Sequence, residues 1–253
     1  MRIDLVNYGM NAKGDHFLCG VTTMALISDN KINMLVDTGS YRSRVHILNA
    51  LAQRHMTVDD VTHVFITHCH WDHVMNMELF RNSTIFIPRL EYEFCANVSP
   101  FNVATPSYVY NMCKGLKLEL LEPKETALFP GVRTVLLHGH SIGQQGILVD
   151  TEDGTALFAG DGIWSARSAY RGRPDMVLVN VEEAMEAVKN ALAQADIVYP
   201  GHDRPFKFKD GKVGEYLFDA EYKFSFAFDP NGTDMELIIN THDNTDRSKY
   251  YKL

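Results

Sequence analysis

The sequence predicts a chain of the α/β or α+β class, because short apolar strands are mixed with helices along most of its length. Residues 62–68 (THVFITH) and 84–88 (TIFIP) have the length and composition of buried strands. Residues 181–194 form the clearest helix, since Asn180 suits the N-cap and Glu183, three residues later, completes a capping-box pattern. No internal repeat or low-complexity linker interrupts the pattern, so we expect a single domain over residues 1–253.

The remaining elements follow in order from apolar runs, helical spacing and turn residues. Asp29 and Asn30 mark a turn between two of the strands. Apolar residues on one helical face favour a helix over 41–55. Strands are expected at 21–28, 32–39, 62–68, 84–88, 132–138, 146–150, 155–161 and 195–202, and helices at 41–55, 89–97, 105–116 and 181–194.

Bulk composition excludes several classes of function. The formal net charge of -8 argues against a broad nucleic-acid-binding surface and, less strongly, against binding an anionic membrane. No run of about 18 apolar residues predicts a membrane span. The start, MRIDLVNYGM, does not resemble a signal peptide, and the four cysteines have no repeated spacing, so a reducing cytoplasm is the expected compartment.

Ligand-type side chains gather at the ends of the expected strands. Asp37, His68, His140, Asp161 and His202 each follow an apolar run. The stretch THCHWDH (67–73) adds three further residues of this type within six positions: His70, Asp72 and His73. Loops at one end of a sheet are a common place to assemble a site on a rigid scaffold.

These residue types suit a metal centre. Zinc favours neutral imidazole and carboxylate oxygen. His68 and His70 are two apart and can face one ion, while Asp72 and His73 follow at once and can turn towards a second. One segment cannot close two coordination spheres, so partners must come from elsewhere. The residues available in glycine-flanked turns are His140, Asp161 and His202.

The ordered set HxHxDH, GH, GD and PGH resembles the metallo-β-lactamase superfamily, over about residues 20–204. The resemblance implies an α/β fold, a four-layer αββα sandwich with metals at one edge of the packed sheets. It implies one ion on His68, His70 and His140 and a second on Asp72, His73 and His202. Asp161 and a hydroxide would bridge the two ions, which would be Zn²⁺, with Fe²⁺, Mn²⁺ or Co²⁺ possible. Asp37 would orient a ligand.

Within this family the chain looks most like the N-acyl-homoserine lactonases. The stretches IPRLEYEF (87–94) and GHSIGQQG (139–146) resemble theirs, although 87–94 also reads as an amphipathic helix that packs Leu90 and Phe94. The resemblance implies hydrolysis of a small lactone, ester or cyclic amide, with Asp72 passing a proton to the leaving group. The lactonases carry a tyrosine where this chain has Trp164, which cannot act as an acid. Trp164 either supplies a wall against the substrate or packs in the core.

Two other activities share these motifs. A thioesterase resembling glyoxalase II would have a largely helical C-terminal region, whereas residues 205–253 read as strands and aromatic segments. An oxygenase resembling the persulfide dioxygenases would hold a single iron. Two neighbouring residues stay open: Cys69 is either a soft ligand or points away from its histidine neighbours, and His138 either shares the face of His140 or is structural. The sequence does not define the oligomeric state.

Overall fold

The computed structural model describes residues 1–13, 15, 18–226 and 235–241. Its contacts divide the chain into two compact units, Met1–Glu215 and Tyr216–Leu253, where the sequence predicts one domain over 1–253.

The first unit is built on two large mixed sheets. One has the strand order β1-β4-β5-β6-β7-β8, with β5 to β8 parallel. The other has the order β15-β14-β13-β12-β11-β10-β9, with β12 and β13 parallel. The strands of the first sheet are β1 (Arg2–Asn7), β4 (Met24–Ser28), β5 (Asn33–Val36), β6 (His63–Phe65), β7 (Thr84–Pro88) and β8 (Lys117–Leu121). Those of the second are β9 (Ala127–Phe129), β10 (Val132–Leu136), β11 (Gln145–Thr151), β12 (Gly154–Gly160), β13 (Ile197–Pro200), β14 (Phe206–Lys209) and β15 (Lys212–Tyr216).

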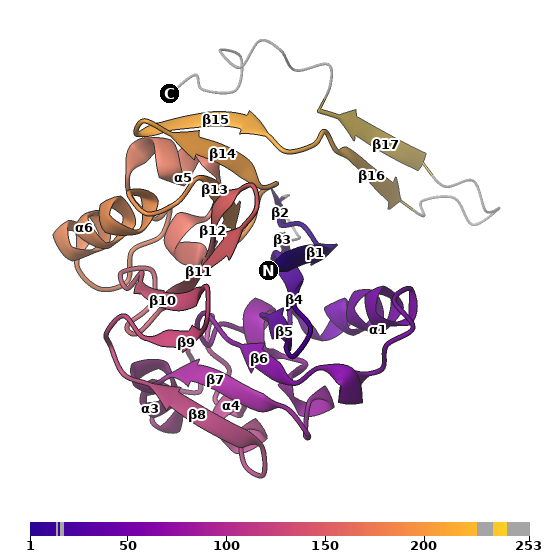
Figure 1. The fold of residues 1–253 in the computed structure, drawn as a ribbon, viewed down its shortest axis with the longest axis vertical. Helices are drawn as coiled ribbons and strands as arrows, with labels where there is room; N and C mark the ends of the chain where they lie inside the picture. Colours follow the sequence, from indigo (N-terminus) through magenta and orange to yellow (C-terminus); the bar gives the residue numbers. More distant parts are fainter. Residues whose placement is uncertain (14, 16–17, 227–234, 242–253) are drawn as a thin grey trace. The chain divides into compact units, whose positions relative to one another are not determined.

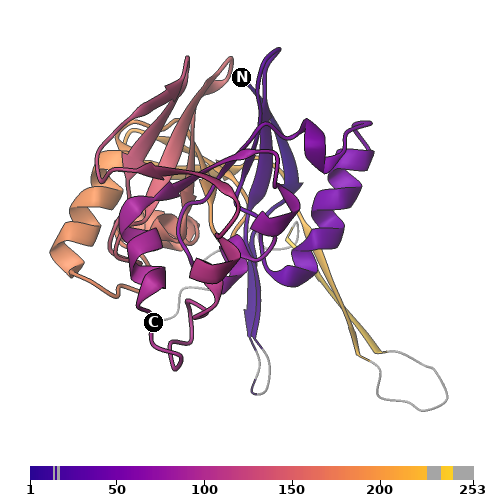
Figure 2. The same ribbon diagram turned by 90° about the horizontal axis from the view of Figure 1, so that it is seen from below.

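Helices cover the outer faces of both sheets, so the unit has four layers in the order αββα (Figures 1 and 2). The expected sandwich is therefore confirmed. The α-helices are α1 (Arg44–Ala52), α2 (Trp71–Val74), α3 (Arg89–Ala96), α4 (Val109–Met112), α5 (Ala166–Arg171) and α6 (Val181–Leu192). Short 3₁₀ turns are η1 (Tyr41–Ser43), η2 (Val58–Asp60), η3 (Met77–Leu79) and η4 (Asp161–Ile163). A separate hairpin joins β2 (Met10–Lys13) and β3 (Leu18–Val21).

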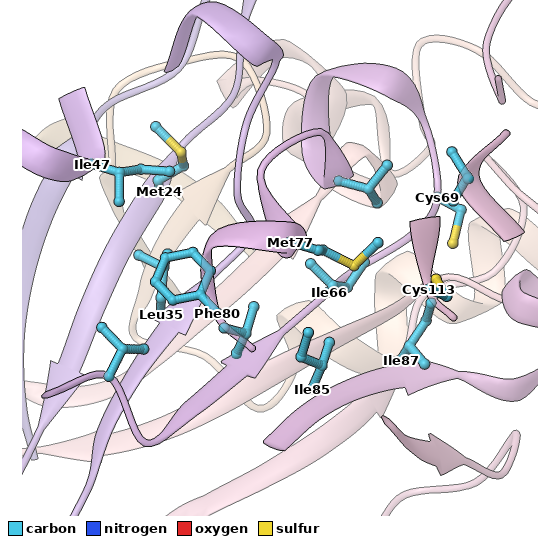
Figure 3. Packing of buried hydrophobic residues seen from close by; sticks show 14 of the residues in the cluster. Met24, Leu35, Ile47, Ile66, Cys69, Met77, Phe80, Ile85, Ile87 and Cys113 are labelled. Carbon is cyan, nitrogen blue, oxygen red and sulfur yellow. The ribbon is translucent and has the colours of Figure 1, made fainter. Parts of the chain in front are cut away.

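Alternation along each strand divides the core into two layers. Ile27 and Phe65 of the first sheet pack against Ile147 and Phe158 of the second. Their neighbours in sequence, such as Leu26, face the other way, towards the helices. Figure 3 shows part of this outer cluster, in which Met24, Leu35, Ile66, Ile85 and Ile87 pack against Ile47, Met77 and Phe80. Packing on both faces explains why the central strands read as continuous apolar runs.

Several expected elements differ from the structure at their ends. The expected helix over 105–116 is confined to Val109–Met112, and the strand over 21–28 is split between Val21 and Met24. The split follows from Thr23, whose backbone N–H and hydroxyl donate to the carbonyls of Gly201 and Pro200, at the end of β13 in the other sheet, rather than to a strand of its own sheet. The sequence interpretation had assigned no strand to β1 or β8, which lie at the two edges of the first sheet.

The second unit contains one described hairpin. Strands β16 (Glu221–Phe226) and β17 (Met235–Asn240) pair antiparallel, in agreement with the strand-like reading of residues 205–253.

Candidate metal centre

The stretch THCHWDH crosses from a strand end into a helix. Strand β6 ends at Phe65, and His68 and His70 lie on the loop that follows. Helix α2 begins at Trp71, so Asp72 and His73 belong to its single turn. All four ligand-type side chains are buried, with His68 and His73 fully inaccessible. The change from loop to helix turns the second pair away from the first, as two coordination spheres require.

The other three side chains come from the second sheet. His140 lies on the loop after β10, Asp161 opens the 3₁₀ turn after β12, and His202 follows β13. Because β12 and β13 are parallel, their carboxyl ends meet at one edge of the sheet. The backbone keeps these two loops close, since Gly201 N–H donates to the Gly160 carbonyl at 3.0 Å.

The structure brings all seven predicted ligands together in two groups. Within each group the potential ligand atoms lie within 4.8 Å of one another. One group is His68, His70, His140 and Asp161, and the other is Asp72, His73 and His202. The division of the six outer residues is the one that the family resemblance implies.

Asp161 faces both groups with different oxygens. Its Oδ2 lies 3.4 Å from His140 Nε2 in the first group. Its Oδ1 lies 3.1 Å from His73 Nε2 and 3.3 Å from His202 Nε2 in the second. A carboxylate in this position can place one oxygen on each of two ions.

Partners outside the centre fix the orientation of three imidazoles. His73 Nδ1 lies 2.8 Å from Asp37 Oδ2. His140 Nδ1 donates to the Met176 carbonyl at 3.1 Å, and His202 Nδ1 donates to the Val21 carbonyl at 3.1 Å. In each case the proton on Nδ1 leaves Nε2 directed at the centre, as in many metal sites.

The charges of the metal-free centre fall into two sets. Burial lowers the pKa of His70 to about 3, with the neighbouring His140 adding to this effect. Burial also acts to lower the pKa of His202, but the carboxylates of Asp161 and Asp72 outweigh it and raise that pKa to about 10. Against burial, His202 and His73 hold the pKa of Asp161 well below its usual value. The first group thus offers neutral imidazoles, whereas the second holds protons that a cation must displace.

Buried polar atoms that lack hydrogen bonds give a separate indication that these residues suit a pair of cations. Four buried atoms aimed into the centre make no hydrogen bond within the described part of the chain: His68 Nε2, His73 Nε2, His202 Nε2 and Asp161 Oδ1. Carboxylate oxygens lie near two of these nitrogens, but without hydrogen-bond geometry. Buried polar atoms are rarely left unpaired. Imidazole nitrogens and a carboxylate oxygen gathered in this way are the donors expected around zinc-type ions.

Trp164 borders the centre from the turn that follows Asp161. Its ring lies 4.8 Å from that of His202 and 5.7 Å from that of His140, between centroids. The indole is partly exposed, so one part of it packs on the two ligand rings and another faces solvent. Trp164 therefore lies beside the two ligand groups, and its contact with substrate stays a prediction.

Cys69 and His138 are the two neighbours of the predicted ligands whose roles the sequence left open. The side chain of Cys69 is buried in the outer apolar cluster (Figure 3), and it belongs to neither ligand group among the described residues. His138 is half-buried and belongs to neither ligand group among the described residues. The sequence interpretation also missed a role for Glu91. The alternative interpretation of residues 87–94, an amphipathic helix that packs Leu90 and Phe94, differs from the structure at Phe94, which is 38% exposed, and it leaves out the buried Glu91.

Comparison with known proteins agrees with this geometry. Residues 18–202 match the family described as the metallo-beta-lactamase superfamily. The metallo-beta-lactamase domain-containing protein 1 of Xenopus laevis is 28% identical over 218 residues, 83% of each chain. The N-acyl homoserine lactonase of Bacillus thuringiensis is 25% identical over 166 residues, 62% of each chain. A crystal structure of a B. thuringiensis AiiA mutant, with N-decanoyl-L-homoserine bound at the active site, superposes with a TM-score of 0.65 at 20% identity and covers 79% of this chain and 92% of that one.

The chain belongs to the metallo-β-lactamase superfamily, and it is a metal-dependent hydrolase. Its relatives include lactonases, as the sequence resemblance predicts. Among the residues that the structure describes, no helix has both the length and the apolar character needed to cross a membrane.

Proposed function

We propose that this chain is a dinuclear zinc hydrolase that opens a lactone ring, with N-acyl-homoserine lactones as the first candidates. The observation that carries the proposal is the placement of Asp161, whose two oxygens face two separate groups of imidazoles. A single-ion site needs no such carboxylate. Two ions would take His68, His70 and His140 on one side and Asp72, His73 and His202 on the other, with Asp161 shared.

Zinc is the proposed metal because the donors are imidazole and carboxylate, and among the described side chains no cysteine belongs to either ligand group. Fe²⁺, Mn²⁺ and Co²⁺ accept the same donors, so they remain alternatives for loading. When bound, such ions would polarise a carbonyl oxygen and lower the pKa of a bound water.

Asp72 is the proposed proton carrier for the leaving oxygen. Burial acts to raise its pKa, but His73 and His202 outweigh burial and lower that pKa below its usual value. The carboxylate of the metal-free protein is therefore ionised at neutral pH, and a neighbouring cation would also favour the ionised form, which can accept a proton. Its Oδ1 lies 4.0 Å from His73 Nε2, beyond hydrogen-bond distance, whereas Oδ2 lies 3.3 Å from His202 Nε2. One oxygen thus stays available to take up a proton and return it to the leaving group.

The surroundings of the centre favour a substrate with an apolar part. Trp164 offers a partly exposed indole face beside the rings of His140 and His202. The segment that holds His140 through the Met176 carbonyl also exposes Met176, Leu178 and Val179. Acyl chains and aryl groups both suit such a margin. With N-acyl-homoserine lactones as substrates, the activity would amount to quorum quenching.

The test is a set of initial hydrolysis rates followed by pH-stat. Metal-stripped and zinc-reloaded protein would be compared on homoserine lactones, other lactones, aryl esters, thioesters and a β-lactam. Zinc-dependent opening of the acyl-homoserine lactones is the expected result. His202→Ala should abolish it, while His46→Ala, which changes an exposed histidine on α1, should not.

Other outcomes redirect the proposal. Turnover of thioesters alone would move the chain to the glyoxalase II-like alternative. No turnover of any ester by zinc-loaded protein, together with one bound iron and oxygen uptake, would favour the dioxygenase-like alternative.

Cytoplasm is the proposed compartment, because Cys69, Cys95 and Cys113 are free and buried, as a reducing environment allows.

A further inference from the structure

Glu91 is a buried carboxylate that belongs to neither ligand group. It lies in the first turn of α3 and is 1% exposed. Buried carboxylates are costly unless several donors satisfy them. Its partners therefore indicate what the side chain does.

Each oxygen of Glu91 binds a different ligand loop. Oε2 accepts the backbone N–H of Cys69 at 3.0 Å, and Oε1 accepts the backbone N–H of Gly143 at 2.7 Å. Cys69 is the residue between His68 and His70, and Gly143 follows His140 on its loop. One carboxylate thus joins the two loops that carry all three histidines of the first group.

The contact on the Gly143 side requires a close approach of backbones. A Cβ atom at Gly143 would lie 2.6 Å from Leu90 Cβ and 2.9 Å from the Glu91 nitrogen. Such distances are below van der Waals contact, so only glycine lets the loop reach α3. The packing of the loop and the hydrogen bond from its N–H are two independent signs of the same attachment.

The Cys69 side is anchored twice. The Cys69 side chain is buried in the outer cluster, in which Figure 3 labels Ile66, Ile87 and Cys113 as well. Its N–H is held by Glu91. Because adjacent side chains of an extended loop point to opposite sides, fixing Cys69 also fixes where His68 and His70 point.

We propose that Glu91 is a positioning residue that sets the separation between the His68–His70 pair and His140, and thereby the affinity of the first metal group. This role rests on the proposed metal centre. Glu91 touches no reacting atom and acts through the two backbone N–H groups. Loss of either hydrogen bond should lower affinity in the first group by about 10- to 100-fold, the range seen when an outer partner of a metal site is removed, and leave Asp72, His73 and His202 unaffected.

Glu91→Gln is the informative variant because it keeps the shape and loses one acceptor. A glutamine side chain has one oxygen and one NH₂ group, so one of the two backbone N–H groups would face another donor. The matched control is Glu93→Gln on the same helix, where the side chain is 57% exposed and its ion pair with Arg89 is a loose 3.8 Å. Gly143→Ala tests the attachment from the other loop with the carboxylate intact.

The experiment is titration of metal-free protein with Co²⁺, followed by its visible spectrum and by chelator competition. Wild type and Glu93→Gln should bind two equivalents with the same spectrum. Glu91→Gln and Gly143→Ala should bind one equivalent normally and the other at least about 10-fold more weakly, with an altered spectrum for that equivalent. Circular dichroism of the metal-free proteins checks folding, and Gly143→Ala decides the matter if Glu91→Gln does not fold.

Two results would overturn the role. One is that both variants match wild type in affinities and spectrum. The other is that both equivalents weaken together in step with a lower melting temperature, which would mark Glu91 as part of the core only. Wild-type protein that fails to bind two equivalents would instead refute the proposed dinuclear centre, and this role with it.

Discussion

Asp37→Asn should weaken one metal equivalent and spare the other. Asp37 is 1% exposed, and its carboxylate accepts the Thr67 backbone N–H at 2.8 Å and the Thr67 hydroxyl at 2.9 Å. The Asp37 Oδ2 atom, which accepts the Thr67 hydroxyl, also lies 2.8 Å from His73 Nδ1. The backbone at Asp37 has φ +54°, a left-handed conformation that asparagine also adopts readily, so the substitution leaves the turn intact.

The amide cannot replace both acceptors. If its oxygen faces Thr67, its NH₂ group meets His73 Nδ1 and forces the ring proton onto Nε2, the atom that faces the centre. If its oxygen faces His73, the buried Thr67 N–H loses its partner, at a cost of about 1–3 kcal/mol. Outer partners of metal-binding histidines are typically worth about 10- to 100-fold in affinity, which corresponds to about 1.4–2.7 kcal/mol.

The assay is calorimetric zinc titration of metal-free protein with a competing chelator. The weakened equivalent should be the one that uses His73, and the three-histidine group should keep its affinity. Asp59→Asn is the control, because Asp59 is exposed and its carboxylate accepts a hydrogen bond from the Asn82 amide. Two zinc equivalents bound by Asp37→Asn with wild-type affinities would refute the orienting role of Asp37.

Three further predictions follow from the core and the centre. The pKa of His202 in metal-free protein is raised from its ordinary value of about 6.5 to about 10, so its ion pairs stabilise the fold fully below the first value and lose their effect as pH rises towards the second. Urea unfolding of metal-free protein should therefore show stability falling between pH 7 and 10, and a weaker slope for His202→Gln; equal slopes would contradict the ion pairs. Phe158→Ala should lower the free energy of unfolding by about 3–5 kcal/mol, because this ring is 2% exposed and stacks on Tyr199 between the sheets. Tyr170→Ala is the control: this side chain is 83% exposed, so its loss should change the free energy of unfolding by less than about 0.5 kcal/mol. Trp164→Ala should raise KM for substrates with an apolar group by about 2- to 10-fold, the worth of one aromatic contact, with zinc content unchanged. Trp164→Phe should restore most of the lost affinity. An unchanged KM in Trp164→Ala would show that the indole does not contact the substrate.

The ligand residues could be predicted from the sequence because their signals are local. His68, His140, Asp161 and His202 each follow a short apolar run, and the structure gathers them into the same groups that the family resemblance implies. Asp37 is also where the resemblance implies, against His73. Strand ends position side chains at the edge of a sheet whatever the rest of the chain does.

Features that depend on distant contacts could not be predicted in this way. A glutamate on a short helix reads as a solvent-facing residue, and Glu91 is buried only because loops at residues 69 and 143 close over it. The helix expected over 105–116 is reduced to Val109–Met112, because the segment before it forms turns in which Asn102 accepts from the backbone of Ala104 and Thr105. The edge strand β1 carries no continuous apolar run and is defined by its pairing with β4.

The central claim is that two ions share Asp161. The most direct measurement is the hydrolysis rate of metal-free protein as Zn²⁺ is added in steps, with bound metal counted in the same samples. The rate should keep rising until about two equivalents are bound per chain, as expected for a two-metal clamp, and Asp161→Asn should stop short of that stoichiometry. Full activity at a single bound equivalent, unchanged by a second, would contradict the account.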